Sequence, residues 1–137
     1  MRLKLLLLIT ASACALTAAD PEGFVYWPKG AAGPAPKFPN HVLSVSHRDK
    51  DGVAELHQKQ TDIMVVQTGE AKLTVGGTIV NPTTASAGEI RGTAIKDGVT
   101  RTLGPGDVIH IPSNVPHQFF VETGKQITYF VVKVNNP

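Results

Sequence analysis

One run of the sequence, from Gly104 to His117, restricts the fold more than any other part of the chain. It reads GPGDVIHIPSNVPH, in which a Gly-Asp turn leads into a short apolar segment and a proline-rich turn follows. The glycines permit backbone angles that other residues resist, whereas Pro112 and Pro116 fix φ and withhold hydrogen-bond donors from a sheet. The run therefore predicts a strand that ends in a rigid turn. His117 follows this turn and is a candidate metal ligand, because imidazole is the commonest one in proteins.

The first nineteen residues have the order of a secretory signal peptide. Arg2 and Lys4 give a positive start, the apolar stretch 5–9 follows, and small residues lead to Ala19. The apolar stretch is too short to span a bilayer, and a buried N-terminal helix is the less favoured interpretation. We therefore expect cleavage after Ala19 and a periplasmic or secreted mature chain. A lipid-anchored form attached through Cys14 is the minority alternative.

The charge balance excludes nucleic acid as a partner. The whole chain has 13 basic and 11 acidic residues, and loss of Arg2 and Lys4 with the leader leaves 11 of each. A neutral mature chain without a basic run or patch lacks the electrostatic footprint of a nucleic-acid-binding protein. No transmembrane span is expected in the mature chain. Its sequence also has no cysteine, so no disulfide is expected even in an oxidising compartment.

After the leader, the sequence predicts an extended arm followed by one domain. Residues 20–40 hold five prolines and three glycines, which favour an extended arm over a helix. Residues 41–137 predict a β domain, because short segments rich in β-branched residues are divided by Gly, Pro and Asn. No helical period of ten residues interrupts them, which indicates an all-β sandwich or barrel. The expected strands are 41–47, 53–57, 62–67, 71–75, 78–80, 107–111, 116–122 and 126–134.

Residues 81–105 are the least regular part of the domain. Residues 81–88 predict a loop, and residues 89–96 predict a further strand that is turned by Asp97 and Gly98. A connection of this length usually has a function or a structure of its own. Two interpretations stay open. The segment is either a lid over a pocket mouth, in which Arg91 meets an anionic ligand, or a surface segment on which Arg91 is an ordinary exposed arginine. The second is favoured.

A second group of polar residues precedes this segment. Glu55 and His57 are two residues apart, so on a strand they share one face. Asp62 begins the next strand after a tight turn, and it can approach His57 from the side because neighbouring strands lie about 5 Å apart. Met64 and Val66 share the face of Asp62 and back it with apolar surface. Polar groups with such backing are typical of a barrel mouth that holds a small ligand.

The two groups together resemble the cupin family, whose members are small jelly-roll barrels of the double-stranded β-helix type. Gly106, Pro112 and His117 match the second cupin motif in register. Asn114 stands at the inner glycine of that motif, and Val121 stands at its final asparagine.

The first cupin motif is also recognisable, although it is degenerate. His57 falls at its second histidine, Asp62 at its glutamate and Gly69 at its closing glycine, while Glu55 takes the place of the first histidine. The resemblance covers roughly residues 41–134. It implies that the domain is a cupin-type barrel.

The resemblance also implies a divalent metal at one end of the barrel. In the family these motif positions hold the metal, which here gives His57, His117, Asp62 and Glu55 as candidate ligands. Two histidines with one carboxylate are associated with non-haem iron(II), and Glu55 in place of a histidine favours iron or manganese over zinc or nickel. Asp62 is one methylene shorter than the family's glutamate, which shortens its reach by about 1.5 Å. The alternative is a metal-free barrel, with both histidines hydrogen-bonded in a polar pocket and Glu55 turned outward to a lysine.

Two classes of function are compatible with these residues. One is a metal-dependent enzyme, dioxygenase- or isomerase-like, in which the metal acts as a Lewis acid or activates oxygen for a small substrate. The other is a non-catalytic module that holds a small ligand in the same pocket, with or without metal. Family membership does not choose between them, and no catalytic residue is assigned. His110 is expected to be structural or exposed, and a homodimer formed through exposed strands is compatible with either class.

Overall fold

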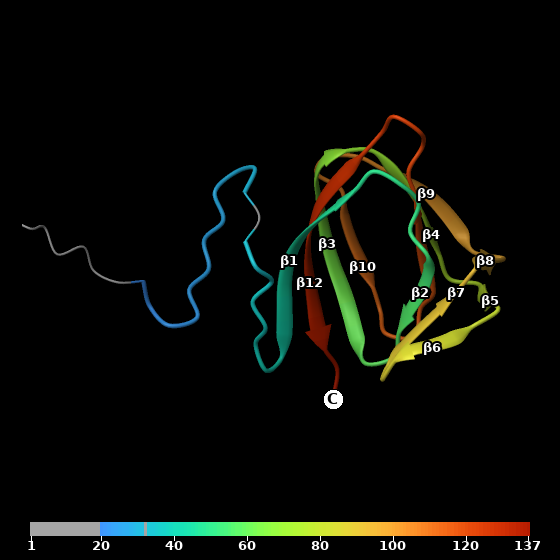
Figure 1. Ribbon diagram of the computed structural model, residues 1–137, viewed down its shortest axis with the longest axis horizontal. Coiled ribbons are helices and arrows are strands. Elements are labelled where there is room, and N and C mark those ends of the chain that lie inside the picture. Colours follow the sequence, from blue (N-terminus) through green and yellow to red (C-terminus); the bar gives the residue numbers. More distant parts are fainter. Residues whose placement is uncertain (1–19, 32) are drawn as a thin grey trace, which may run out of the picture.

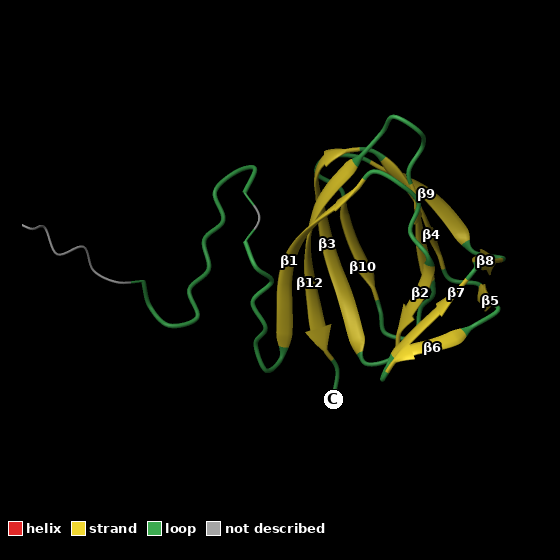
Figure 2. Cartoon of the chain, viewed as in Figure 1, coloured by secondary structure: helices red, strands yellow, loops and turns green. Residues whose placement is uncertain are grey.

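The computed structural model describes residues 20–31 and 33–137, in which every regular element is a β-strand (Figure 2). The all-β class expected from the sequence is confirmed. The expected leader, residues 1–19 with Cys14, lies outside the described residues. Within the described part there is no helix long and apolar enough to cross a membrane. The strands are β1 (His41–Arg48), β2 (Ala54–His57), β3 (Gln60–Gly69), β4 (Ala71–Val75), β5 (Thr78–Val80), β6 (Thr83–Ser86), β7 (Glu89–Gly92), β8 (Ala94–Lys96), β9 (Val99–Leu103), β10 (Val108–Ile111), β11 (His117–Phe120) and β12 (Ile127–Asn135).

Two antiparallel sheets face each other and form a jelly-roll barrel (Figure 1). One sheet has the strand order β1-β12-β3-β10, and the other has the order β6-β7-β2-β11-β4-β9. The strands β5 and β8 form a separate two-stranded ribbon. Because β12 lies between β1 and β3, the C-terminal strand completes the first sheet and joins the beginning of the domain to its middle.

Apolar side chains fill one part of the space between the sheets. Phe119 of β11 stacks on Tyr129 of β12, with 5.0 Å between ring centroids and 9° between ring planes. The two rings come from opposite sheets, and such a pair contributes about 0.5 to 1.5 kcal/mol beyond the area it buries. The rest of the interior is polar and contains the candidate site. The buried core consists of Met64, Val66, Ala71, Leu73, Leu103, Ile111, Phe119, Val121, Ile127, Tyr129 and Val131.

The segment 81–105 is mostly strand and forms part of the barrel wall. The strand β6 pairs with β7, β7 pairs with β2, and β9 pairs with β4. The expected loop at 81–88 is therefore wrong, because it contains β6, whereas the strand expected at 89–96 is observed as β7 and β8. The segment forms wall rather than a lid, and Arg91 of β7 lines the cavity. All four residues of β6 are exposed, so this strand has no alternation of polar and apolar residues from which it could be recognised.

Two turns explain how the degenerate motifs still fold as a barrel. Gly69 has φ of 80°, and a Cβ there would collide with the carbonyl oxygen of Gln126, so the position requires glycine. Asn114 stands at a glycine position of the second motif and has φ of 63°, a left-handed conformation that asparagine tolerates better than most residues. Its backbone N–H donates to the carbonyl oxygen of His57 at 2.8 Å. This bond fixes the turn before His117 against the end of β2.

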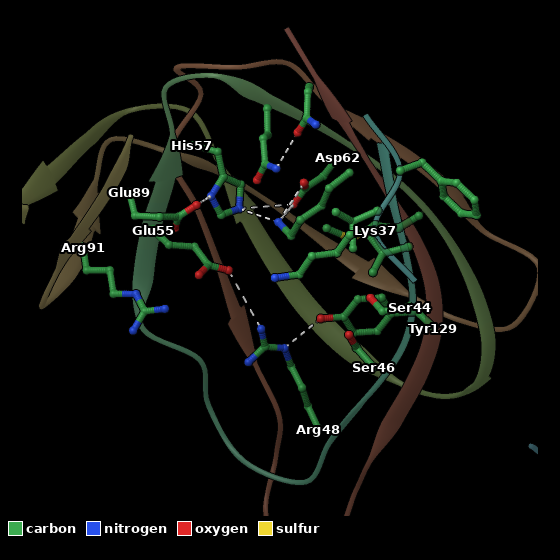
Figure 3. Close-up of a pocket in the computed structure, with 17 residues that line it drawn as sticks. Lys37, Ser44, Ser46, Arg48, Glu55, His57, Asp62, Glu89, Arg91 and Tyr129 are labelled. Atoms are coloured by element: carbon green, nitrogen blue, oxygen red, sulfur yellow. Dashed lines mark hydrogen bonds and ion pairs between the residues drawn. The ribbon is translucent and has the colours of Figure 1, made fainter. Parts of the chain in front are cut away.

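The described part of the arm, between residues 20 and 36, forms neither helix nor strand. Trp27 meets Phe130 edge-on, with ring centroids 6.3 Å apart, and Lys37 then forms an isolated bridge with Val42 of β1. Phe24 and Tyr26, by contrast, are exposed. The end of the arm therefore joins the edge of the first sheet and brings Lys37 to the polar end of the barrel (Figure 3).

Candidate metal centre

The polar part of the interior is a cavity of about 620 Å³ between the two sheets (Figure 3). The side chains that line it are two residues apart along each strand, because alternate residues of a strand face the same side. Side chains that face inward from one sheet therefore meet side chains that face inward from the other. They are Val42, Ser44, Ser46 and Arg48 of β1; Glu55 and His57 of β2; Gln60, Asp62 and Met64 of β3; Glu89 and Arg91 of β7; and Tyr129, Val131, Lys133 and Asn135 of β12, with Lys37 and Phe38 of the arm.

The register of strand pairing selects which polar side chains become neighbours. His117 lies opposite Glu55 in the β11–β2 pair, and His57 lies opposite Glu89 in the β2–β7 pair. Residues directly opposite each other in an antiparallel pair have their Cβ atoms about 4.5 to 5.5 Å apart. Each histidine is therefore supplied with a carboxylate by the strand beside it.

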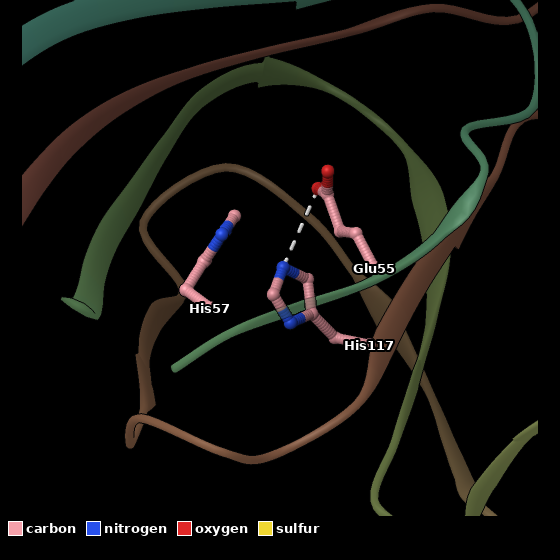
Figure 4. Close-up of side chains that lie close together, drawn as sticks. All are labelled: Glu55, His57 and His117. Carbon is pink, nitrogen blue, oxygen red and sulfur yellow. Dashed lines mark ion pairs between the residues drawn. The ribbon is translucent and has the colours of Figure 1, made fainter. Parts of the chain in front are cut away.

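His117 has an unpaired ring nitrogen next to Glu55, a residue that lines the cavity. Its Nδ1 donates to the carbonyl oxygen of Val115 at 3.2 Å, which leaves the lone pair on Nε2. This Nε2 is fully buried and has no hydrogen-bond partner among the described residues. The nearest carboxylate oxygen is Glu55 Oε1 at 3.4 Å (Figure 4). A buried nitrogen without a partner costs free energy, so it needs an explanation.

His57 is oriented in the same way by a carboxylate. Its Nδ1 is 2.6 Å from Glu89 Oε1, and its Nε2 is 2.8 Å from Lys133 Nζ. An ammonium has only donors, so His57 Nε2 accepts this bond and Nδ1 carries the proton given to Glu89. A carboxylate that holds the outer nitrogen of a histidine is the usual support for a metal ligand.

Glu55, His57 and His117 form the group that fits a metal. Each offers one ligand atom, and the three atoms lie within 4.8 Å of one another. Two atoms bound to the same ion at about 2.1 Å lie roughly 3.0 to 3.4 Å apart, and the distance from His117 Nε2 to Glu55 Oε1 is 3.4 Å. Two imidazole lone pairs and one carboxylate suit a divalent transition metal. This donor set also accounts for the unpaired nitrogen of His117.

Asp62 contacts both histidines but is held by a cation of the protein. Its Oδ2 is 3.4 Å from His57 Nε2 and 3.8 Å from His117 Nε2. Lys133 Nζ donates to both carboxylate oxygens of Asp62, at 2.8 and 3.0 Å. The approach of Asp62 to His57 expected from the sequence is therefore observed, while the carboxylate within the compact group of three is that of Glu55.

The ionisable groups around the cavity shift one another's pKa values. Burial raises the pKa of Asp62, but His57 and Lys133 outweigh it and hold that pKa below its ordinary value. Burial likewise raises the pKa of Glu55, and His117, His57 and Arg48 together lower it further than burial raises it. For His57 burial lowers the pKa, while Asp62 and Glu89 outweigh it and raise it. The carboxyl groups of Asp62 and Glu55 are therefore ionised at neutral pH.

Two residues of the centre, Lys133 and Glu89, were not anticipated from the sequence. Lys133 follows Tyr129 and Val131 on the inward face of β12. A lysine at a position where the alternation calls for an apolar residue is a signal in the sequence from which it could have been found. Glu89 gave no comparable signal, because its contact with His57 depends on the pairing of β7 with β2. His110 is exposed on β10, in agreement with the expectation.

Comparison with known proteins agrees with the fold and the motifs. The pattern of the cupin domain family matches residues 86–133, which include His117. No curated protein matches the chain. The domain therefore resembles a cupin domain: its barrel is of the cupin type, and the family pattern matches over β7 to β12.

Solved structures share the barrel at low sequence identity. An uncharacterised protein with a double-stranded β-helix domain from Klebsiella pneumoniae matches with a TM-score of 0.54 and 15% identity, over 82% of this chain and 84% of that one. A protein from Bacillus halodurans matches with a TM-score of 0.53 and 12% identity, over 72% and 64% of the two chains. FeII HppE matches with a TM-score of 0.51 and 16% identity, over 69% of this chain and 44% of that one. At these identities the likeness concerns the fold alone.

Proposed function

We propose that this protein binds a divalent metal through Glu55, His57 and His117 and uses it on a small molecule in the adjoining cavity. The single observation that carries the proposal is the buried, unpaired Nε2 of His117 beside Glu55. A metal ion would satisfy this nitrogen and would bind Glu55 and His57 as well, in place of the bond that His57 Nε2 accepts from Lys133. The cavity of about 620 Å³ then provides room for a substrate next to the ion.

Iron(II) or manganese is the proposed metal, with zinc or nickel as the alternatives. Two histidines and a carboxylate are the ligand set of many non-haem iron sites, and three protein ligands leave positions open for a substrate. FeII HppE, which has the same fold, supports iron within such a barrel. When bound, the metal supplies Lewis acidity or oxygen activation, as in dioxygenase- or isomerase-like chemistry. Glu89 orients His57 for this role, and Val115 orients His117.

The metal content of the purified protein tests the proposal. The domain is purified without added metal or chelator, and bound metals are measured for the wild type, His57→Ala, His117→Ala and Glu55→Gln. We expect near-stoichiometric metal in the wild type and its loss in all three variants. His110→Ala is the matched control, because His110 lies on β10 and is exposed. A wild type that is metal-free and gains no stability from added iron(II), manganese, zinc or nickel overturns the proposal.

One observation favours a second function, a metal-free binding module. Lys133 Nζ bonds to His57 Nε2 and to both oxygens of Asp62, so the protein already supplies a cation to part of the centre. In this module Lys133 takes the place of the metal and the cavity only binds its ligand. Manganese titrations of the wild type and Lys133→Met separate the two functions. Binding by both proteins supports the metal centre, whereas binding by the variant alone supports the module.

Export of the protein is part of the proposal. The leader order of residues 1–19 supports it, with cleavage after Ala19. The full chain is expressed in a bacterium, and the N-terminus of the product in the periplasm and medium is sequenced. A chain that begins at Asp20 is the expected product. An uncleaved chain that stays in the cytoplasm contradicts export, and a chain that begins with a lipid-modified Cys14 supports the anchored alternative.

A further inference from the structure

We propose that the ligand of this cavity is a small organic carboxylate, and that Arg48 and Lys37 hold its charged end. The inference rests on the proposed function in so far as the cavity binds a small molecule. It does not depend on the metal, because the cationic groups that carry it are side chains of the protein.

The charged residues around the cavity leave an excess of positive charge. Four cationic and three anionic side chains line it, and a divalent metal adds further positive charge. Two of the three carboxylates are engaged within the centre, Asp62 with Lys133 and Glu89 with His57, while Glu55 lies 3.4 Å from His117 and 3.9 Å from Arg48. An anion is the ligand that balances such a cavity. The cationic side chains are Lys37, Arg48, Arg91 and Lys133.

Lys37 and Arg91 have side chains that are not committed to a partner. Among the residues that the structure describes, neither side chain forms a hydrogen bond or an ion pair within 4.0 Å. Both line the cavity, and Lys37 extends into it from the side of the arm (Figure 3). They provide positive charges in the cavity lining, where they attract an anion without fixing its orientation.

Arg48 provides the fixed anchor. Its Nε donates to the hydroxyl of Tyr129 at 2.9 Å, and its guanidinium lies 5.1 Å from the ring centroid of Phe119. These contacts hold the planar group in one orientation. Its Nη2 is 3.9 Å from Glu55 Oε1, which is too long for a hydrogen bond. The terminal N–H groups therefore stay available, and their fork matches the two oxygens of a carboxylate.

The walls indicate that the anion has an organic body. Phe38, Val42, Met64 and Val131 give the cavity apolar surface, and the hydroxyls of Ser44 and Ser46 lie beside it on β1. An inorganic anion such as phosphate would leave this surface and most of the volume unused. A carboxylic acid with an apolar or partly hydroxylated body fits both the charged end and the walls.

The position of Arg48 relates the ligand to the metal centre. Glu55 Oε1 is 3.9 Å from Arg48 Nη2 and 3.4 Å from His117 Nε2. A carboxylate held by Arg48 therefore has its adjacent carbon atoms next to the group formed by Glu55 and the two histidines. This is the part of the acid that would undergo chemistry if the metal centre is catalytic.

Binding of matched acids and amides tests the inference. The purified protein is treated with chelator and titrated with aliphatic and aromatic monocarboxylic acids, each paired with its neutral primary amide, and with inorganic phosphate. Calorimetry and thermal shift report binding. We expect the best acid to bind at least tenfold more tightly than its amide and than phosphate. No acid binding better than its amide overturns the inference, and equal binding of phosphate shows a general anion site and also overturns it.

Two variants test whether Arg48 and Lys37 hold the acid, and the second covers the case in which the first does not fold. Arg48→Gln is expected to weaken the best acid at least tenfold, and Lys37→Met is expected to weaken it severalfold. Arg101→Gln is the matched control, because Arg101 is exposed on β9 and outside this cavity. Unchanged acid affinity in Arg48→Gln and Lys37→Met, with folding verified by circular dichroism, overturns the assignment. Should Arg48→Gln misfold, Lys37→Met alone decides it. Metal content measured in parallel separates the two proposals: acid binding by a protein that takes up no metal refutes only the metal centre.

Discussion

Lys133 and Asp62 lie directly opposite each other in the β12–β3 pair, and the ammonium group donates to both oxygens of the carboxylate at 2.8 and 3.0 Å. Asp62 is almost completely buried, with 2% of its side chain exposed, whereas 30% of the Lys133 side chain is exposed. The same ammonium reaches across the barrel to His57 Nε2. One side chain of the first sheet thus neutralises a buried carboxylate and contacts a histidine of the second sheet.

Removal of the Lys133 charge is expected to destabilise the metal-free protein. In Lys133→Met, Asp62 stays buried without its partner. Breaking a fully buried pair costs about 3 to 5 kcal/mol, and the partial exposure of Lys133 reduces our expectation to ~2 kcal/mol. Urea unfolding in the presence of chelator measures the loss. Lys96→Met, at an exposed lysine on β8, is the control, and an equal effect of the two variants contradicts the prediction.

Glu89 is expected to act on the metal through His57. Glu89→Ala removes the acceptor that fixes the Nδ1 proton of His57, so the ring is free to turn. Loss of such a supporting carboxylate typically weakens metal binding about 10- to 100-fold. Isothermal titration with manganese measures the affinity, with Glu70→Ala as a control at an exposed carboxylate between β3 and β4. Unaltered manganese affinity in Glu89→Ala would show that this bond does not orient a ligand.

Asp62 is expected to make the metal-free protein sensitive to acid. The pKa of Asp62 is lower in the folded protein than the ordinary value of 3.8. Its contribution to the free energy of unfolding is therefore complete above that value and is lost as the pH falls through the folded-state pKa. In Asp62→Asn this part of the pH dependence disappears, so the free energy of unfolding changes less with pH below about pH 4. Urea unfolding across the acid range tests this, with exposed Asp49→Asn as the control; parallel curves for wild type and Asp62→Asn contradict it.

Gly69 is expected to be needed for closing the first sheet. Gly69→Ala adds a Cβ that collides with the carbonyl oxygen of Gln126 at a φ of 80°. Gly124 has φ of 81° but nothing near the position of a Cβ, so Gly124→Ala tests the cost of the backbone angle alone. That cost is about 1 to 2 kcal/mol, and we expect Gly69→Ala to lose at least ~3 kcal/mol through the added clash. Thermal unfolding measures both variants. Equal losses of stability in Gly69→Ala and Gly124→Ala would mean that the backbone at Gln126 moves away from the added Cβ without a cost in free energy.

The sequence predicts those features of the site that depend on spacing within one strand or motif. Glu55 and His57 share a face because they are two residues apart, and the spacing of the Gly-Pro-His motif places His117 on the strand after a rigid turn. The contacts of Lys133 with Asp62 and of Glu89 with His57 depend instead on register between strands that are distant in the chain. A single sequence has no local pattern that sets this register.

Within the segment 81–105, the strand β6 is not predictable for a related reason. Strands are recognised by alternation of buried and exposed residues, and β6 lies at the edge of its sheet with all four residues exposed. Without β6, one of the two partners of β7 is missing, and the pairing of β7 with β2 that places Glu89 beside His57 has no local signal. The fold class was predictable because enough other strands alternate, whereas this part of the wall was not.

The division of the centre between two sheets makes its geometry depend on the spacing of the barrel walls. Lys133 and Asp62 belong to one wall, and Glu55, His57 and His117 belong to the other. Every contact between the two groups, from the 2.8 Å bond of Lys133 with His57 to the 3.8 Å approach of Asp62 to His117, crosses the interior. Separation of the walls by a single ångström breaks the shortest of these contacts but leaves each wall's hydrogen-bond ladder whole. The contacts of Lys133 and Asp62 with the two histidines therefore depend on how closely the walls approach each other, whereas Glu55, His57 and His117 keep their relative positions within one wall.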